Sequence, residues 1–195
     1  MRVMIVGSGG RECALARCLS ASKGLEELVI APGNPGTTEY GRNIEVGLDD
    51  VVGLVAAARS ERIDLVVVGP EIPLSLGLSD ELAKVGIVCF GPSASAARIE
   101  SSKAFSTAFM ERNGIPTASA RIFSDAREAK AYATILPRLP VVKASGLSAG
   151  KGVIICKDLE EAIHEFTQML EKERFGVASA KVVIEEFLSG IELSV

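Results

Sequence analysis

Short apolar runs alternate with amphipathic stretches from the N-terminus to Phe90, a pattern that is typical of βαβ units. The apolar runs predict strands at Arg2–Val6, Glu27–Ala31, Asp64–Val68 and Ile87–Phe90. The amphipathic stretches predict helices at Glu12–Ser20, Val51–Ser60 and Leu78–Val85. Because these strands are apolar on both faces, we expect a parallel sheet that is covered by helices.

The pattern changes after the turn signal at Gly91–Pro92. Helices are predicted at Ala94–Glu100, Lys103–Asn113, Asp125–Ala133 and Leu159–Leu170, and strands at Ala118–Phe123, Val141–Lys143, Val153–Cys156 and Lys181–Glu186. Gly114 is placed to end one helix, and Asp125 to cap another. The glycine loop after Lys143 predicts antiparallel pairing of the strands it joins. We expect an α/β chain with a Rossmann-like, parallel-sheet domain at residues 1–101 and a small α+β layer at 102–195.

Composition narrows the class of protein. Hydrophobic residues make up 48% of the 195 residues, aromatic residues only 5%, and Trp is absent, so Val, Ile, Leu and Ala must build the core. The formal net charge is −4 with no basic run, which argues against a nucleic-acid surface. Apolar runs such as Leu65–Val68 are too short to cross a membrane, and Met1–Val6 is a first strand and not a signal peptide.

Cysteine and histidine usage excludes several chemistries. The four cysteines show no metal-binding spacing, and we expect them to be buried and reduced in a cytosolic protein. His164 is the one histidine, and its polar neighbours predict a surface position. A single histidine in this setting argues against a Ser–His or Cys–His hydrolase.

The loop Gly7-Ser8-Gly9-Gly10-Arg11-Glu12 lies between the first strand and the first helix. Its glycines allow close approach of a ligand to the backbone, and the helix N-terminus offers free N–H groups to a phosphate. Arg11 adds a cation there. The third glycine of a dinucleotide fingerprint is replaced by Glu12, which argues against an NAD-dependent oxidoreductase. A tight turn without a ligand is the alternative.

Two further loops follow predicted strands, where ligands of open α/β sheets bind. Ala31–Thr37 contains Pro32, Gly33 and Asn34, and Val68–Leu74 contains Gly69, Pro70 and Glu71. Glu71 stands between two prolines and is predicted to lie in a rigid loop. Its carboxylate either accepts hydrogen bonds from a ligand or is an ordinary solvated acid.

The stretch from Lys143 to Gly152 predicts a flexible loop that closes over a polyphosphate. Its glycines permit mobility, and Lys143 and Lys151 would neutralise phosphate charge. It is not a Walker loop, because Gly152 follows the lysine where Ser or Thr is needed. A glycine hairpin with exposed lysines is the alternative.

The last strand runs into Glu185 and Glu186, followed by Phe187 and Leu188. Its backbone offers hydrogen bonds for an adenine, and Glu192 could accept from ribose hydroxyls. A strand end with solvated acids is the alternative.

Together these motifs resemble those of the phosphoribosylamine–glycine ligases, or glycinamide ribonucleotide synthetases. The motifs that carry the resemblance, in order, are Gly-Ser-Gly-Gly-Arg-Glu, Ala-Pro-Gly-Asn, Val-Gly-Pro-Glu, Glu-Ser-Ser-Lys-Ala-Phe, Gly-Ile-Pro-Thr-Ala, Val-Lys-Ala-Ser-Gly-Leu-Ser-Ala-Gly-Lys-Gly-Val and Val-Ile-Glu-Glu-Phe-Leu. The resemblance spans the chain, and it implies that residues 102–195 are the N-terminal part of an ATP-grasp domain and residues 1–101 the domain that precedes it.

The family joins glycine to 5-phosphoribosylamine through glycyl phosphate in de novo purine synthesis, with ATP and Mg²⁺. The resemblance implies that the substrate's ribose phosphate is held by Gly9, Gly10, Arg11, Glu12, Pro32, Gly33, Asn34, Gly69, Pro70 and Glu71. It assigns ATP contacts to Lys103, Lys143, Ser145, Gly146, Gly150, Lys151, Gly152, Glu185, Glu186, Phe187, Leu188 and Glu192. The catalytic residues stay unassigned, and the metal ligands are expected beyond this chain.

The chain departs from the family pattern in length and at several positions, among them Pro35, Ile72 after Glu71 and Ile191 before Glu192. Cys13 stands where the family's first loop usually has histidine. The family's chains also continue well past Val195, so we expect these residues to have little ligase activity alone, or to be part of a longer, multifunctional purine-synthesis polypeptide. Another ATP-grasp ligase and a non-catalytic nucleotide- or phosphoribosyl-binding module are the alternatives.

Overall fold

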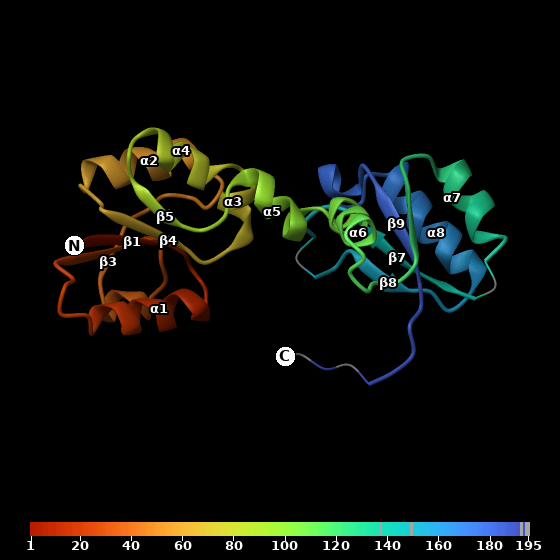
Figure 1. Ribbon diagram of the computed structural model, residues 1–195, viewed down its shortest axis with the longest axis horizontal. Helices are drawn as coiled ribbons and strands as arrows, with labels where there is room; N and C mark the ends of the chain where they lie inside the picture. The colour runs from red at the N-terminus through yellow and green to blue at the C-terminus, as the bar shows by residue number, and fades with distance from the viewer. Residues whose placement is uncertain (137, 149, 192, 194–195) are drawn as a thin grey trace. The chain divides into compact units, whose positions relative to one another are not determined.

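The computed structural model describes residues 1–195 with the exception of 137, 149, 192, 194 and 195 (Figure 1). The chain divides into two compact units, Met1–Arg98 and Ile99–Val195, each with its own sheet and core. They are described separately below as the first unit and the second unit.

The first unit contains a five-stranded parallel sheet with the order β3-β2-β1-β4-β5. Its strands are β1 (Arg2–Gly7), β2 (Glu27–Pro32), β3 (Arg42–Asn43), β4 (Leu65–Val68) and β5 (Val88–Phe90). Its helices are α1 (Gly10–Ser20), α2 (Val51–Ser60), α3 (Glu71–Ser75) and α4 (Leu78–Lys84), with a 3₁₀ turn η1 (Thr37–Glu39). Helix α5 (Ala94–Ser101) begins in the first unit and ends in the second. Helix α1 covers one face of the sheet, and α2 and α4 cover the other (Figure 1).

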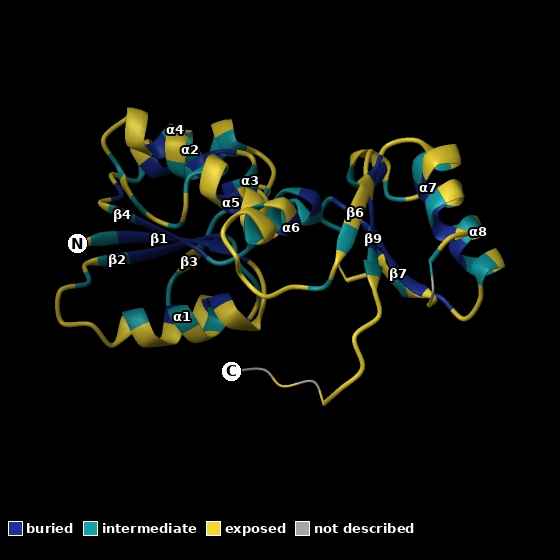
Figure 2. Cartoon of the chain, turned by 45° about the vertical axis from the view of Figure 1, so that its right-hand side comes forward, coloured by how far each residue is buried: buried dark blue, intermediate teal, exposed yellow. Residues whose placement is uncertain are grey.

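The two faces of this sheet are both apolar, as the sequence predicted. On one face Met4, Val29 and Val66 pack with Leu54 and other residues of α2 and α4. On the other face Val3, Ile5, Leu28 and Ile30 pack with Ala16 of α1. Figure 2 shows the resulting buried central strands and the exposed outer side of α1. The register pairs Val3–Val6 with both β2 and β4, so the carboxyl ends of these strands lie side by side.

Two expectations for the first unit were wrong. Strand β5 is not covered on both faces, since Val88 and Phe90 at this edge are exposed. Glu71 does not lie in a loop but begins the short helix α3, with Pro73 in its first turn, where a missing N–H is tolerated. The sequence also did not predict β3 and η1, which are too short to show a periodicity.

The second unit contains an antiparallel sheet with the order β6-β9-β7-β8. Its strands are β6 (Ala120–Phe123), β7 (Pro140–Ala144), β8 (Val153–Ile155) and β9 (Val182–Glu186). Its helices are α6 (Lys103–Arg112), α7 (Ala126–Ala133) and α8 (Leu159–Leu170), with a 3₁₀ turn η2 (Gly176–Ser179). Phe166 and Met169 of α8 and Ala129 of α7 pack against Val142 and Ile184, which places both helices on one face of the sheet.

Three predictions for the second unit are confirmed: the pairing of two strands, the cap of one helix and the end of another. Strands β7 and β8 pair antiparallel, as the glycine loop predicted. The Asp125 carboxylate caps α7 by accepting hydrogen bonds from the amides of Arg127 and Glu128. Helix α6 ends at Arg112, and Gly114 has a φ of +65°, which glycine adopts readily.

The cysteines are free, but they are not all buried as expected. Cys18 is exposed on α1, and Cys13 and Cys89 are half-buried. Cys156 is buried, and burial raises the pKa of its thiol to about 11. His164 is exposed on α8, as predicted. Within the described chain, no helix has both the length and the apolar character that a bilayer crossing requires.

Candidate functional site

Three glycine-containing loops meet at the carboxyl edge of the first unit's sheet, after β1, β2 and β4. The Gly33 amide donates to the carbonyl of Gly7 at 3.1 Å. The Asn34 side chain donates to the carbonyls of Ser8 and Gly9 at 3.0 and 3.2 Å. Arg11 donates to the carbonyl of Gly69. The loops that the sequence singled out separately are therefore joined in one place.

The start of α1 presents backbone N–H groups at this edge. Gly9 is the N-cap residue in an extended conformation and has no side chain to cap the helix. Gly9, Gly10 and Arg11 are exposed, and the Arg11 guanidinium lies over the carbonyl end of β4. A helix N-terminus with an adjacent guanidinium favours an anion.

Glu12 lies beneath this surface and not on it. The residue is 4% exposed, and its Oε2 accepts a hydrogen bond from the Gly9 amide at 2.6 Å. Its Oε1 lies 3.9 Å from Nε of Arg11. The carboxylate thus holds the loop together from inside, which is a different position from the ligand contact that the resemblance implies.

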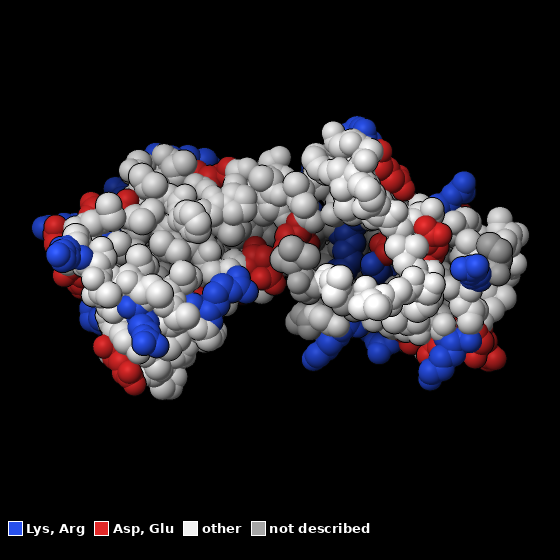
Figure 3. Space-filling model, turned by 60° about the horizontal axis from the view of Figure 1, so that its bottom comes forward, with Lys and Arg blue, Asp and Glu red and all other residues white. Residues whose placement is uncertain are grey.

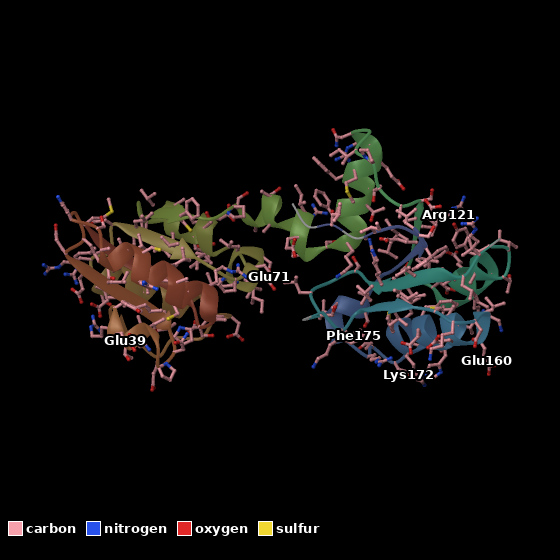
Figure 4. The ribbon with its side chains drawn as sticks, turned by 90° about the horizontal axis from the view of Figure 1, so that it is seen from below. Glu39, Glu71, Arg121, Glu160, Lys172 and Phe175 are labelled. Atoms are coloured by element: carbon pink, nitrogen blue, oxygen red, sulfur yellow. The ribbon has the colours of Figure 1, made fainter. Side chains whose placement is uncertain are left out.

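Glu71 lies after β4, at the same edge of the sheet. It is half-buried at the start of α3 (Figure 4), directly after Pro70, and its carboxylate takes part in no hydrogen bond or ion pair of the described residues. An acid with free lone pairs beside an anion-binding helix N-terminus suits the hydroxyl groups of a sugar. Pro32, at the end of β2, follows a cis peptide bond.

A cluster of charged side chains lies on the second unit's sheet, on the face away from α7 and α8. Lys143 of β7 forms an ion pair with Glu185 of β9, while Val142 and Ile184 point into the core. Lys103, at the start of α6, donates from Nζ to the carbonyl of Gly146 at 3.3 Å. Figure 3 shows basic and acidic side chains at the bottom of a hollow in this unit.

The charges of this cluster act on one another. The pKa of Lys103 is lowered, first because burial disfavours its charged form and second because the positive charge of Lys143 is near. Glu100 and Glu185 act in the opposite direction. Nearby carboxylates neutralise the two lysines only in part. The remaining positive charge is suited to binding a polyphosphate.

The loop that joins β7 and β8 is fixed at both ends. Ser145 is buried, and its backbone carbonyl and Oγ accept hydrogen bonds from the amides of Lys103 and Ala104 at 2.7 and 3.1 Å. The Gly146 amide donates to the carbonyl of Ala178 in η2 at 3.0 Å. At the other end, the carbonyl of Gly152 accepts from the Ala144 amide at 2.8 Å.

Between these ends, Gly150 and Lys151 are exposed, and Gly150 has a φ of +77°. The segment is thus a strand–loop–strand hairpin, as the sequence predicted, with a glycine-containing tip that carries one lysine. Ser145 and Gly146 belong to its anchored part.

The end of β9 borders an apolar cavity of about 380 Å³. The cavity is lined by Phe187 and Ser189, by Arg138 and Leu139 before β7, and by Ile155 and Cys156 at the end of β8. Apolar walls suit a flat heteroaromatic base. Leu188 is exposed next to it, and Glu192, the proposed ribose acid, lies outside the described residues.

The side chain and the backbone amide of Glu186 both form hydrogen bonds with Ser119. Its Oε1 accepts a hydrogen bond from the Ser119 amide at 2.8 Å, and its own amide donates to the carbonyl of Ser119 at 2.9 Å. The hydrogen bond from the Ser119 backbone is the main reason why the pKa of Glu186 is lowered.

Sequence reasoning missed two residues that support the loops at the first unit's edge, Thr37 and Asn43. Both form hydrogen bonds with Asn34, at 2.7–2.9 Å. The spacing of Asn34 and Thr37 is a turn signal that could have indicated the first of these contacts. Asn43 lies on the two-residue strand β3, for which the sequence offers no signal.

A solved structure with the same arrangement is a phosphoribosylamine–glycine ligase from Thermotoga maritima. It is 30% identical, with a TM-score of 0.80 over 98% of this chain and 45% of its own. The biotin carboxylase domain of the Hydrogenobacter thermophilus 2-oxoglutarate carboxylase also has a TM-score of 0.80, at 20% identity. Together with the family model of an ATP-grasp domain that matches residues 101–195, the fold defines an ATP-grasp protein.

Family models match the whole chain. Residues 1–100 match the family described as "Phosphoribosylglycinamide synthetase, N domain", and residues 101–195 match "Phosphoribosylglycinamide synthetase, ATP-grasp (A) domain". The chain belongs to the phosphoribosylglycinamide synthetase family.

Two curated relatives show how much of such a protein the chain represents. A phosphoribosylamine–glycine ligase of Allochromatium vinosum is 50% identical over 199 residues, which cover 100% of this chain and 46% of the relative. The trifunctional purine biosynthetic protein adenosine-3 of Gallus gallus is 45% identical over 99% of this chain and 20% of its own length. The chain spans about half the length of the curated ligases that it matches.

Proposed function

We propose that this chain takes part in the ATP-dependent ligation of glycine to 5-phosphoribosylamine, which gives glycinamide ribonucleotide in purine biosynthesis. In this reaction the glycine carboxylate attacks the γ-phosphoryl group of ATP and ADP leaves. The amine nitrogen of the ribosylamine then attacks the carbonyl carbon of glycyl phosphate, and phosphate leaves. Membership of the family and its named relatives support this proposal.

The observation that carries the proposal for the first unit is the convergence of its three loops. The exposed amides at the start of α1 and the guanidinium of Arg11 would bind the 5-phosphate. The free carboxylate of Glu71 would accept hydrogen bonds from ribose hydroxyls. Pro32–Asn34 and Gly69–Pro70 would form the walls of this site.

In the second unit, Lys103 and Lys143 would neutralise the phosphates of ATP, and the tip of the loop with Gly150 and Lys151 would close over them. The apolar cavity beside Phe187 would hold the adenine. Glu185 would position Lys143 through their ion pair. These residues bind and orient the nucleotide, and no catalytic residue is assigned to this chain.

Mg²⁺ is the metal of this proposal, but the described residues do not fit it. No group of three or more His, Cys, Asp or Glu side chains in the described part of the chain could hold a metal ion. We therefore derive no step of the reaction through the metal from this chain.

We place the activity in the cytoplasm and in a polypeptide longer than this chain. The four free thiols are in keeping with a reducing compartment. The trifunctional relative from Gallus gallus supports the second point, because this chain matches 20% of its length. The expected partners are the small-molecule substrates, and neither a nucleic acid nor a membrane.

Binding to the 195-residue chain tests the proposal unit by unit. Isothermal titration with ribose 5-phosphate is expected to show binding that Arg11→Met weakens by about tenfold, the loss of one charge-assisted hydrogen-bonding group. Titration with ATP is expected to show binding that Lys143→Met weakens similarly. Arg17→Met and Lys130→Met are the matched controls, because each removes an exposed cation elsewhere, on α1 and on α7.

Each result has a contrary outcome. If ribose 5-phosphate does not bind, or binds equally to Arg11→Met, the assignment of the first unit is wrong. If NADH binds more tightly than ATP, and Lys143→Met has no effect, the assignment of the second unit is wrong.

A further inference from the structure

The side chain of Asn34 is fully used in joining two loops of the first unit. Its amide nitrogen donates to the carbonyls of Ser8 and Gly9, and its Oδ1 accepts from the amides of Gly36 and Thr37 at 2.8 and 3.2 Å. An asparagine side chain has two donor hydrogens and two acceptor lone pairs. Asn34 therefore has no hydrogen-bonding capacity left for a ligand, and it connects the β2 loop to the start of α1.

The backbone of Asn34 is held by a closed ring of hydrogen bonds with Thr37 and Asn43. The Asn34 amide donates to Oγ1 of Thr37 at 2.9 Å. The Thr37 hydroxyl has two acceptors for its one hydrogen, the Asn34 carbonyl at 2.7 Å and Oδ1 of Asn43 at 2.8 Å. Nδ2 of Asn43 donates back to the carbonyl of Asn34 at 2.9 Å. Thr37 is 0% exposed, so water cannot replace the hydroxyl if it is removed.

The position of Asn43 is fixed by its strand and by its neighbour. It pairs with Ile30 in the register of β2 and β3. A Cβ on Gly33 would lie 2.4 Å from Cγ of Asn43, so the Asn43 amide fills the space beside this glycine, which has a φ of +73°. The short elements η1 and β3 therefore place the Thr37 hydroxyl and the Asn43 amide within hydrogen-bonding distance of Asn34.

We propose that Thr37 and Asn43 are positioning residues for the ribose phosphate site, acting through Asn34 on the carbonyls of Ser8 and Gly9. These carbonyls belong to the peptide groups that carry the amides of Gly9 and Gly10. The Gly9 amide donates to Glu12, and the Gly10 amide is the one whose direction toward a phosphate would be set in this way. The inference rests on the proposed function of the first unit, since neither residue reaches the ligand edge itself.

The test compares Thr37→Val with Thr37→Ser in the 195-residue chain. Valine keeps the shape of threonine and removes the hydroxyl, whereas serine keeps the hydroxyl. We expect Thr37→Val to bind ribose 5-phosphate about tenfold more weakly, the cost of one unpaired buried group, and Thr37→Ser to remain within about twofold of the unchanged chain. Asn43→Asp, which replaces the donor to the Asn34 carbonyl with an oxygen, is expected to behave like Thr37→Val.

A second measurement separates positioning from loss of stability. Backbone amide chemical shifts of Gly9, Gly10 and Arg11 in the free protein are expected to change in Thr37→Val and Asn43→Asp, and to stay unchanged in Thr37→Ser. The titration and the chemical shifts can be measured on Thr37→Val and on Asn43→Asp. The inference is therefore tested even if only one of these two variants folds. Unchanged shifts in a folded Thr37→Val or Asn43→Asp protein would overturn the inference.

The inference and the proposed function fail in different ways. If ribose 5-phosphate does not bind to the unchanged chain, the proposed function of the first unit fails, and the chemical shifts still decide whether the ring positions these amides. If the ligand binds and Arg11→Met weakens it, but Thr37→Val does not, the positioning role fails alone.

Discussion

Oε1 of Glu12 occupies the space that a side chain on Gly69 would need. A Cβ on Gly69 would lie 1.9 Å from this oxygen, while the other oxygen of Glu12 accepts the hydrogen bond from the Gly9 amide. The buried carboxylate of α1 is thus locked between the loops that follow β1 and β4. This contact explains why a glycine follows β4 without invoking a ligand.

Gly69→Ala should therefore destabilise the first unit. The added methyl group would force the Glu12 carboxylate away from the Gly9 amide and leave a buried charge without its partner. We expect a loss of about 2–4 kcal/mol in the free energy of unfolding. The chain contains two tyrosines and no Trp, with Tyr40 in the first unit and Tyr132 in the second. Fluorine NMR of 3-fluorotyrosine during urea titration therefore reports each unit separately.

Gly10→Ala is the matched control, because a Cβ at this position meets nothing within 4 Å. Its unfolding midpoint at Tyr40 should equal or exceed that of the unchanged chain, since alanine favours a helix. A Gly69→Ala protein within about 0.5 kcal/mol of the unchanged chain would show that Glu12 moves without cost, and the interlocking would be disproved.

The long helices and strands of both units could be predicted because their buried apolar residues recur at regular intervals along the sequence. Val51–Ser60 was predicted with its observed bounds, and so was Leu159–Leu170. The elements that were missed, such as β3 and α3, contain two and five residues. Their positions depend on contacts with other strands and loops, and a pattern along the chain does not contain that information.

The candidate site shows the same division. The places of the glycine loops and of Lys143 relative to the strands could be predicted, because apolar runs mark the strands that they follow or end. Their role in binding phosphate stays a prediction. Whether a polar side chain faces the ligand or the protein could not be predicted, since Glu12 and Glu186 hold backbone amides of their own unit. Sequence spacing fixes which residues are near one another, but the direction of each side chain follows from tertiary packing.

Ser145→Ala should destabilise the second unit. The hydroxyl of Ser145 is buried and accepts the hydrogen bond from the Ala104 amide at the start of α6. Its loss leaves that amide unpaired, at a cost of about 1–2 kcal/mol in the free energy of unfolding. The fluorotyrosine signal of Tyr132 measures the change, and that of Tyr40 should not move. Ser124→Ala, which removes an exposed hydroxyl before α7, should have no effect. An equal effect of both substitutions would argue against a stabilising hydrogen bond from the Ala104 amide to Ser145.

Acid should weaken the first unit through an ion-pair network at the amino ends of its strands. Glu27 accepts a hydrogen bond from Arg42 at 3.2 Å and pairs with Arg2 at 2.5 Å. The hydrogen bond from Arg42 is the main reason why the pKa of Glu27 lies below its ordinary value of 4.5. A lowered pKa in the folded state means that the stabilisation is present above pH 4.5 and is lost as the pH falls through the folded pKa.

Glu27→Gln should accordingly reduce the dependence of the Tyr40 urea midpoint on pH between about pH 5 and about pH 3. Glu39→Gln is the control, because its exposed carboxylate takes part in no ion pair of the described residues. The same slope in Glu27→Gln and in the unchanged chain would mean that other groups cause the loss of stability in acid.

Lys143→Met should raise the pKa of Lys103. Burial of the Lys103 amine is the first cause of its lowered pKa and stays in place, but the repulsion from Lys143, the second cause, disappears. Glu185 also loses the ion pair with Lys143, so more of its negative charge acts on Lys103. Both changes favour the protonated amine, and both therefore have the same sign.

NMR titration of ¹⁵N-labelled lysine side chains measures this pKa directly, and Lys130→Met, on the exposed side of α7, should leave it unchanged. An unchanged or lower pKa of Lys103 in Lys143→Met would show that the two amines do not sense each other. They would then not present the joint positive charge that a nucleotide's phosphates require. The assignment of the cluster of Lys103, Lys143 and Glu185 as a phosphate site would lose its physical basis. A raised pKa would instead show that the two lysines share one electrostatic environment, as binding of a single polyphosphate requires.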